Sequence, residues 1–166
     1  MDTFDLYKDI QCRTNGEIYL GVVGPVRSGK STFIKRFMDV LVLPKMTDEH
    51  AKERTVDELP QSASGKSIMT TEPKFIPKEA ANVKLFGENE VKIRLIDCVG
   101  YIVKGAEGLY EEQNERMVMT PWSEEPMPFA KAAEYGTKKV IHDHSTIGIV
   151  ITTDGSFGDI SRQSYK

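Results

Sequence analysis

An α/β fold, in which helices cover both faces of a mostly parallel β-sheet, is the architecture that this sequence of 166 residues predicts. Two observations support it. Apolar runs typical of buried strands occur at 18–23, 91–96 and 146–152, and helical spacings of apolar residues follow the first run and precede the last. Strands that alternate with helices in this way are typical of a three-layer sandwich with right-handed crossover connections.

The first part of the chain starts with a polar N-terminal arm, 1–16, followed by one domain that we place at 17–166. The first strand is expected to end near Val23. A helix should follow, with an apolar stripe at spacings of three and four residues: Phe33, Ile34, Phe37, Met38 and Leu41. Pro44 is expected to end this helix. Residues 45–69 are polar and charged without lasting periodicity, which predicts a long mobile loop.

The second part of the chain contains three segments with strand patterns in succession: 74–76, 83–86 and 91–96. Residues 98–128 are rich in glycine, proline and acidic residues. A helix is expected at 128–142, before the apolar strand at 146–152. Domains of this type normally have at least one more strand and helix. We therefore expect the sequence to be truncated at its C-terminus, so that the last strand leaves an exposed edge and an uncovered apolar face.

Composition excludes several classes of function. The chain suits one core and is too short for two ordinary domains. Its net charge of −3 argues against nonspecific nucleic-acid binding, so no nucleic-acid partner is expected. The two cysteines, Cys12 and Cys98, indicate a reducing compartment. With neither a signal-peptide pattern nor an apolar run of transmembrane length, we expect a cytoplasmic protein that meets membranes only indirectly.

Residues 24–31 read Gly-Pro-Val-Arg-Ser-Gly-Lys-Ser, which is the complete phosphate-binding loop (P-loop) pattern Gly-x-x-x-x-Gly-Lys-Ser/Thr between a strand and a helix. In this setting, backbone N–H groups at a helix N-terminus point toward phosphate oxygens. Lys30 is expected to reach the β- and γ-phosphates, and the Ser31 hydroxyl to bind Mg²⁺. The pattern predicts a nucleoside triphosphate site lined by Gly24, Pro25, Val26, Arg27, Ser28, Gly29, Lys30, Ser31 and Thr32.

A second motif, Asp-x-x-Gly at 97–100, follows the apolar strand that ends at Ile96. Asp97 at a strand end can hold Mg²⁺ through its water shell, and the N–H of Gly100 can meet the γ-phosphate. Between the two motifs, a threonine hydroxyl is expected to bind Mg²⁺ and sense the γ-phosphate. Thr71 is the favoured candidate and Thr70 the alternative. The predicted metal-binding residues are Ser31, Thr70, Thr71 and Asp97.

Arg27 lies inside the P-loop, three residues before Lys30. A guanidinium there can neutralise charge that develops along the β–γ bridge, as an arginine finger in cis. The alternative, an arginine that pairs with an acidic neighbour in solvent, stays open. Tyr101 stands where small GTPases carry the glutamine that orients water, so hydrolysis is expected to use another group or a partner's surface. The predicted catalytic residues are Lys30, Arg27, Asp97 and Thr71.

Several stretches resemble the stage IV sporulation protein A family, and together they cover nearly the whole chain: 18–24, 26–35, 57–62, 70–75, 94–101, 120–122 and 144–148. The resemblance implies a P-loop NTPase of the GTPase-like (TRAFAC) type that uses ATP and Mg²⁺. By position, it makes Lys30 the Walker A lysine, Asp97 the Walker B aspartate and Thr70 or Thr71 the sensor threonine.

The same resemblance implies a role in spore-coat morphogenesis. ATP hydrolysis would drive self-assembly into a basement layer on the outer forespore membrane, in the mother-cell cytoplasm. Its implied partners are further copies of the protein, a small amphipathic membrane-anchoring peptide and other spore coat proteins. The residues themselves leave two alternatives open, a GTP-binding molecular switch and a nucleotide-stabilised scaffold without hydrolysis, because no base-reading Asn-Lys-x-Asp-type motif lies within the 166 residues.

Overall fold

The computed structural model describes residues 12, 14–60, 72–84, 90–102, 110–111 and 114–152. A four-stranded sheet forms its centre, in the order β2-β3-β1-β8, with bounds Lys74–Lys84 (β2), Glu90–Asp97 (β3), Glu17–Val23 (β1) and Ile147–Val150 (β8). Strand β1 runs parallel to both β3 and β8, whereas β2 is antiparallel to β3. The predicted α/β class with a mostly parallel sheet is therefore confirmed.

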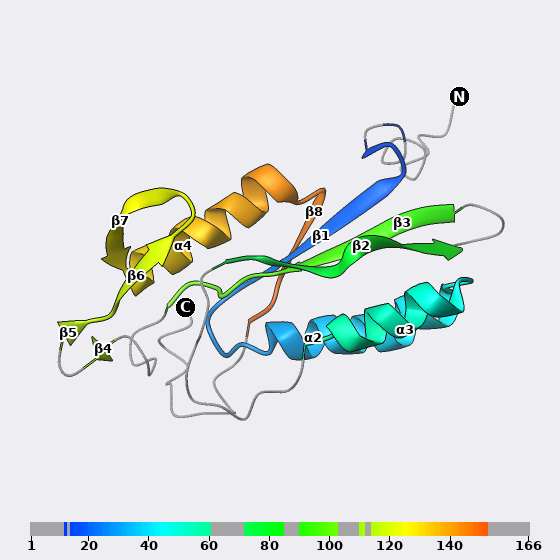
Figure 1. Ribbon diagram of the computed structural model, residues 1–166, viewed down its shortest axis with the longest axis horizontal. Helices are drawn as coiled ribbons and strands as arrows, with labels where there is room; N and C mark the ends of the chain where they lie inside the picture. Colours follow the sequence, from blue (N-terminus) through cyan, green and yellow to red (C-terminus); the bar gives the residue numbers. More distant parts are fainter. Residues whose placement is uncertain are drawn as a thin grey trace.

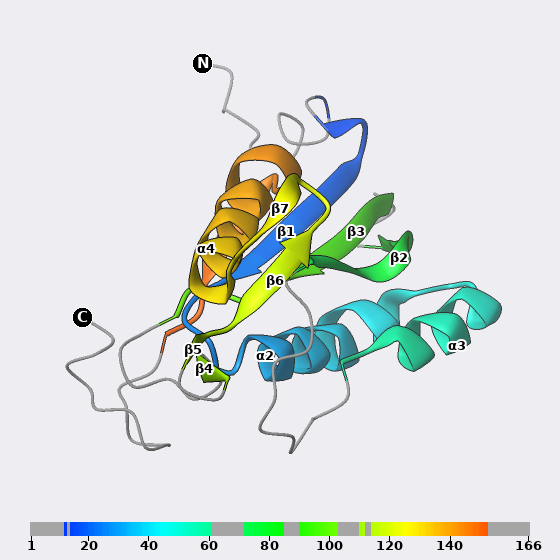
Figure 2. The ribbon, with the colours of Figure 1, turned by 60° about the vertical axis from the view of Figure 1, so that its left-hand side comes forward.

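Helices lie on both faces of this sheet (Figures 1 and 2). One face carries α2 (Lys30–Phe37) and α3 (Glu49–Glu58), and the opposite face carries α4 (Phe129–Lys139). Helix α2 continues through the π-helical turn η1 (Met38–Val42) into the 3₁₀ turn η2 (Leu43–Lys45), and α4 continues into the π-helical turn η3 (Val140–His144). The described elements thus form three layers.

The main core lies between the sheet and α2. Ile34 and Met38 of the predicted apolar stripe are fully buried there, against Val22 and Leu95 of the sheet. The stripe does not extend to Leu41, which is exposed, because the wider π-helical turn shifts the buried position to the next residue, Val42. A smaller cluster on the other face packs η3 against β1 and β3, with the buried residues Val23, Ile96, Cys98 and Val140.

The predicted loop over 45–69 is wrong for its first half, where α3 forms. The side chain of Asp48 caps this helix, accepting hydrogen bonds from the backbone N–H groups of His50 and Ala51 at 3.0 and 3.2 Å. The helix buries little apolar surface, with Thr55 its buried residue, so its sequence shows weak periodicity. Residues 61–69 lie outside the described residues.

The predicted strand at 74–76 and the first two residues of the predicted strand at 83–86 belong to one strand, β2, whose pairing with β3 shifts register between Ile76 and Ala81. Residues 85 and 86 lie outside the described residues. The bulge at that shift breaks the apolar alternation that marks a continuous strand. No strand is predicted within 98–128, but the structure has two short hairpins there: β4 (Tyr110–Glu111) with β5 (Asn114–Glu115), and β6 (Met117–Thr120) with β7 (Ser123–Pro128).

Strand β8 was predicted to be buried, but it lies at the edge of the described sheet. Val150 is 69% exposed and Ile147 is 40% exposed, because β8 pairs with β1 on one side only among the described residues. None of the helices in the described part of the chain is long and apolar enough to cross a membrane.

Candidate nucleotide-binding site

The P-loop lies between the end of β1 and the start of α2, as predicted (Figure 1). Its two pattern glycines have positive φ angles, 149° at Gly24 and 91° at Gly29. A Cβ atom on Gly24 would lie 2.0 Å from the backbone oxygen of Ile151, so this turn requires glycine. Gly29 accepts the first helical hydrogen bond of α2, from Phe33 N–H at 2.8 Å. The structure thus brings the predicted residues 24–32 together at a helix N-terminus.

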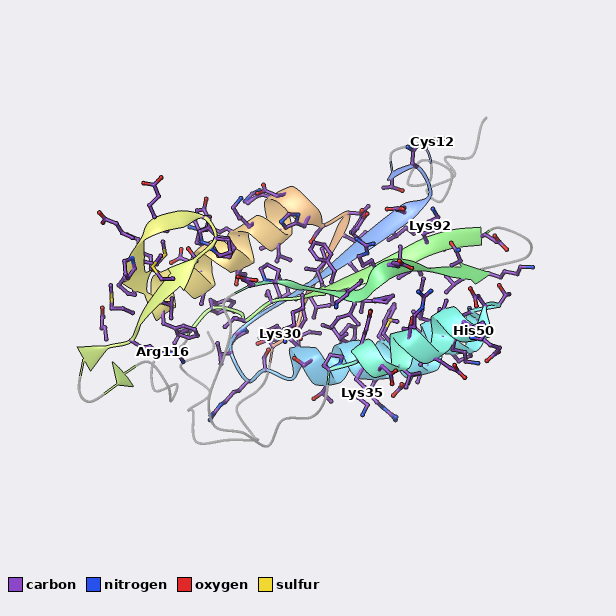
Figure 3. All side chains as sticks on the ribbon, viewed as in Figure 1. Cys12, Lys30, Lys35, His50, Lys92 and Arg116 are labelled. Carbon is purple, nitrogen blue, oxygen red and sulfur yellow. The ribbon has the colours of Figure 1, made fainter. Side chains whose placement is uncertain are left out.

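Lys30 begins α2 and is buried, and its Nζ donates a hydrogen bond to the backbone oxygen of Pro25 at 2.7 Å (Figure 3). Burial lowers the pKa of Lys30, which the nearby Cys98 and Asp97 partly offset. An ammonium group held in this way against the loop lacks full hydration. Phosphate oxygens would therefore be favourable partners for it.

Ser31 and Asp97 meet although 66 residues separate them, and the Ser31 hydroxyl donates a hydrogen bond to Asp97 Oδ2 at 2.7 Å. They meet because β1 and β3 are parallel neighbours whose carboxyl ends share one edge of the sheet. Burial raises the pKa of Asp97, and the Ser31 hydrogen bond and Lys30 oppose this. Asp97 Oδ1 is buried and has no hydrogen-bond partner among the residues that the structure describes. A hydroxyl beside an unsatisfied carboxylate oxygen suits the oxygen-ligand chemistry of Mg²⁺.

The Asp-x-x-Gly segment is attached to the P-loop by its backbone. The Tyr101 N–H donates to Gly24 O at 3.2 Å, and the Val26 N–H donates to Tyr101 O at 2.8 Å. Gly100 has φ 87°, and a Cβ atom there would lie 2.1 Å from Gly24 O and 2.5 Å from Lys30 Nζ. Gly100 therefore lies against the P-loop lysine. The backbone role of Tyr101 has no signal in the sequence, because any residue type can make these bonds.

The structure adds less about three further predicted site residues, Arg27, Thr70 and Thr71. Arg27 is exposed and has φ 62°, a left-handed backbone conformation that costs a residue with a Cβ roughly 1–2 kcal/mol. Thr70 and Thr71 lie outside the described residues, so their assignment to the metal stays a prediction.

Cys98 is a site residue that sequence reasoning missed. Its buried thiol donates to Val22 O at 3.4 Å and lies 3.9 Å from the hydroxyl oxygen of Thr137 in α4. Burial raises the pKa of this thiol. Cys98 thus joins the Asp-x-x-Gly segment to both β1 and α4. In the sequence, the burial of Cys98 is indicated by its apolar neighbours, Leu95 and Ile96 before it and Val99 after it.

Replacing Asp97 with asparagine is expected to stabilise the magnesium-free protein. The substitution removes a carboxylate that burial disfavours, while the amide oxygen can still accept the Ser31 hydrogen bond. Because the pKa of Asp97 is raised in the fold, the free energy of unfolding of the wild type falls as pH rises through that pKa. The stabilisation of Asp97→Asn relative to the wild type is therefore largest at neutral pH. We expect Tm to rise by about 2–4 °C, which corresponds to about 1 kcal/mol in a chain of this size.

Thermal melts in EDTA measure this effect, and Asp143→Asn is the matched control. The exposed Asp143 pairs with Lys139 at 3.1 Å, so its loss should leave Tm unchanged or slightly lower. MgATP should raise the Tm of the wild type and of Asp143→Asn but not that of Asp97→Asn. A lower Tm for magnesium-free Asp97→Asn would contradict the proposed cost of the buried carboxylate.

Comparison with known proteins identifies the family. The model of the family described as "Stage IV sporulation protein A, ATPase domain" matches residues 1–166. The chain is 60% identical to stage IV sporulation protein A of Bacillus subtilis (strain 168) over 165 residues, which cover 99% of the chain and 34% of that relative. Stage IV sporulation protein A of Bacillus anthracis is 58% identical over 99% of the chain and 34% of that relative. Stage IV sporulation protein A of Clostridioides difficile (strain 630) is 59% identical over 97% of the chain and 33% of that relative.

The chain spans about one third of the length of these curated relatives. No solved structure matches it. The family model covers the P-loop, the Asp-x-x-Gly segment and every described element around them. The chain belongs to the stage IV sporulation protein A family, and it matches that family's ATPase domain.

Proposed function

We propose that this chain binds ATP together with Mg²⁺ and hydrolyses it. The observation that carries the proposal is the hydrogen bond from Ser31 to Asp97, beside the unsatisfied Oδ1 of the same carboxylate and the buried ammonium of Lys30. Lys30 and Ser31 belong to the P-loop and Asp97 to the Asp-x-x-Gly motif, the two motifs expected in a nucleotide-hydrolysing domain. The family description, which names an ATPase domain, supports ATP as the nucleotide.

Each residue contributes a distinct interaction in this proposal. Ser31 and Asp97 would hold Mg²⁺, together with Thr71 or Thr70. When bound, Mg²⁺ supplies charge neutralisation on the phosphate oxygens. Lys30 would leave its hydrogen bond to Pro25 for a phosphate oxygen, and the Gly100 N–H would be a further donor to the γ-phosphate.

Arg27 would act on the charge that develops during cleavage of the β–γ bond. Two observations support this role: the side chain of Arg27, the fourth residue of the P-loop, is exposed, and its backbone is left-handed. A planar guanidinium is suited to two phosphate oxygens at once. Because Tyr101 cannot orient water as a glutamine does, another group or a partner's surface would orient the attacking water.

Phosphate release in MgATP tests the proposal. We expect turnover that EDTA abolishes and that excess GTP does not inhibit, together with an upward shift of Tm in MgATP. Equal competition by GTP would favour the molecular-switch alternative. A raised Tm without phosphate release would favour a scaffold that uses nucleotide only for stability.

We propose further that hydrolysis drives self-assembly of the spore coat basement layer. The support is the membership of the chain in a sporulation family, together with the sequence resemblance. The proposed setting is the mother-cell cytoplasm at the outer forespore membrane, with a small amphipathic peptide and other coat proteins as partners. Sedimentation of the full-length protein in ATP, compared with a non-hydrolysable analogue, tests this step: polymer in both nucleotides would contradict a role for hydrolysis.

A further inference from the structure

A polar cavity of about 450 Å³ lies on the α4 face of the sheet, away from the nucleotide-binding site. The sheet contributes one wall, with Tyr19 of β1, Arg94 of β3 and Phe75 of β2. The turn from η3 to β8 contributes the other wall, with His144, Ser145 and Thr146. In Figure 1, this turn lies at the end of α4 that is remote from the P-loop.

Arg94 is held between two aromatic rings in this wall. Its guanidinium carbon lies 5.5 Å from the centroid of the Tyr19 ring and 5.6 Å from that of Phe75. The parallel register sets Tyr19 directly beside Arg94, which fixes the arrangement. Among the described residues no carboxylate forms an ion pair with Arg94, and its Nε is buried without a hydrogen-bond partner. The rings orient this cation but do not neutralise its charge.

The opposite wall is held rigidly in place. Thr146 N–H donates to Tyr19 O at 2.8 Å, and Tyr19 N–H donates to the Thr146 hydroxyl oxygen at 3.2 Å. The hydroxyl proton of Thr146 is therefore available to a ligand. Ser145 donates to Val140 O at 2.6 Å, and a Cβ on Gly21 would lie 1.9 Å from the Ser145 oxygen, so glycine permits this close approach.

The carboxylates near the cavity already have cationic partners. Asp143, which also lines it, accepts a hydrogen bond from Lys139 at 3.1 Å. Glu17, on the neighbouring part of β1, accepts the Tyr19 hydroxyl and lies 3.7 Å from Lys92. Glu17 also attracts Arg94 electrostatically, but among the described residues no carboxylate pairs with the guanidinium, so its buried Nε–H remains without an acceptor.

We propose that this cavity binds an oxyanion, with the Arg94 guanidinium as the charged donor and the Thr146 hydroxyl as a neutral one. The planar Arg94 guanidinium, positioned by the Tyr19 and Phe75 rings, can make two parallel hydrogen bonds to a carboxylate or phosphate. Because its side chain is already ordered, binding costs little further conformational entropy. The oxyanion comes either from a free anion or from an acidic side chain of a polypeptide. This inference is independent of ATP binding, because its residues lie outside both nucleotide-binding motifs.

An NMR titration tests the proposal on the 166-residue chain. One arm uses inorganic phosphate and the other N-acetylglutamate amide, which carries a glutamate side-chain carboxylate, with sodium chloride at equal ionic strength as the reference. We expect saturable shifts of the Ser145 and Thr146 amides and of the Arg94 Nε–H with one of the probes. The probe that saturates identifies the source. Phosphate in the nucleotide-binding site is observed separately, through the amides of the P-loop.

Arg94→Gln should weaken this binding at least about tenfold, and Arg94→Lys should recover little of it, because a lysine lacks the fork. Lys84→Gln is the matched control: it removes one positive charge from the same sheet and should change affinity less than about twofold, since Lys84 is exposed and neither it nor its partner Glu90 lines the cavity. Shifts that follow chloride alone, or that persist unchanged in Arg94→Gln, would overturn the proposal. The amide spectrum of each variant shows directly whether it is folded.

Discussion

Lys30→Ala is expected to reduce ATP turnover by about 10²- to 10³-fold or more, the loss that follows removal of one preorganised charge-stabilising donor. The ammonium of Lys30 is buried beside Gly100 and Asp97, where water screens its charge poorly. Its present hydrogen bond, to a neutral backbone oxygen of Pro25, leaves room for a stronger bond to a phosphate oxygen. Steady-state phosphate release, together with nucleotide affinity from the MgATP-induced shift of Tm, measures the loss.

Lys35→Ala is the matched control for this substitution. Lys35 lies five residues further along α2, outside the P-loop (Figure 3). Turnover by Lys35→Ala should equal that of the wild type. If Lys30→Ala kept turnover within about twofold of the wild type, the assignment of the P-loop would be wrong.

Arg27→Ala is expected to lower kcat by at least about tenfold while KM and nucleotide affinity stay nearly unchanged. A cationic finger acts on charge that develops in the transition state, so its loss affects the rate and leaves ground-state binding intact. The left-handed φ of 62° at Arg27 supports this role, because glycine would adopt the same backbone without strain and strained backbone is concentrated at functional sites. Steady-state kinetics and equilibrium nucleotide binding, measured on the same preparation, separate the two effects.

Three variants sharpen the test. Arg27→Lys should recover little activity, because lysine is a point charge without the planar fork. Arg27→Gly relaxes the left-handed backbone and removes the guanidinium, so it should be as slow as Arg27→Ala if the side chain is responsible. Arg36→Ala, at an exposed position of α2, should behave as the wild type. Equal losses of affinity and rate in Arg27→Ala would instead make Arg27 an ordinary phosphate-binding cation.

The nucleotide-binding site was predictable to a large extent because its parts are local. The P-loop is a continuous segment, so its glycines and its lysine can be recognised within a few consecutive residues. The structure has this loop between β1 and α2, as expected. The Asp-x-x-Gly motif was also found from its position after an apolar strand. Helix α3 was missed because its stability rests on the cap at Asp48 and on packing against β2, neither of which creates a periodic apolar pattern.

The sequence by itself determined the fold class, the family and the position of the phosphate-binding turn, because strand runs, helical periodicity and a short motif are all encoded over a few consecutive residues. Only the tertiary structure decided that Ser31 bonds to Asp97, that the Tyr101 backbone joins the P-loop, and that Arg94 lies between two rings. Each of these contacts joins segments that are distant along the chain. Their register is set by the pairing of strands and the burial of the shared core, which local sequence patterns do not encode.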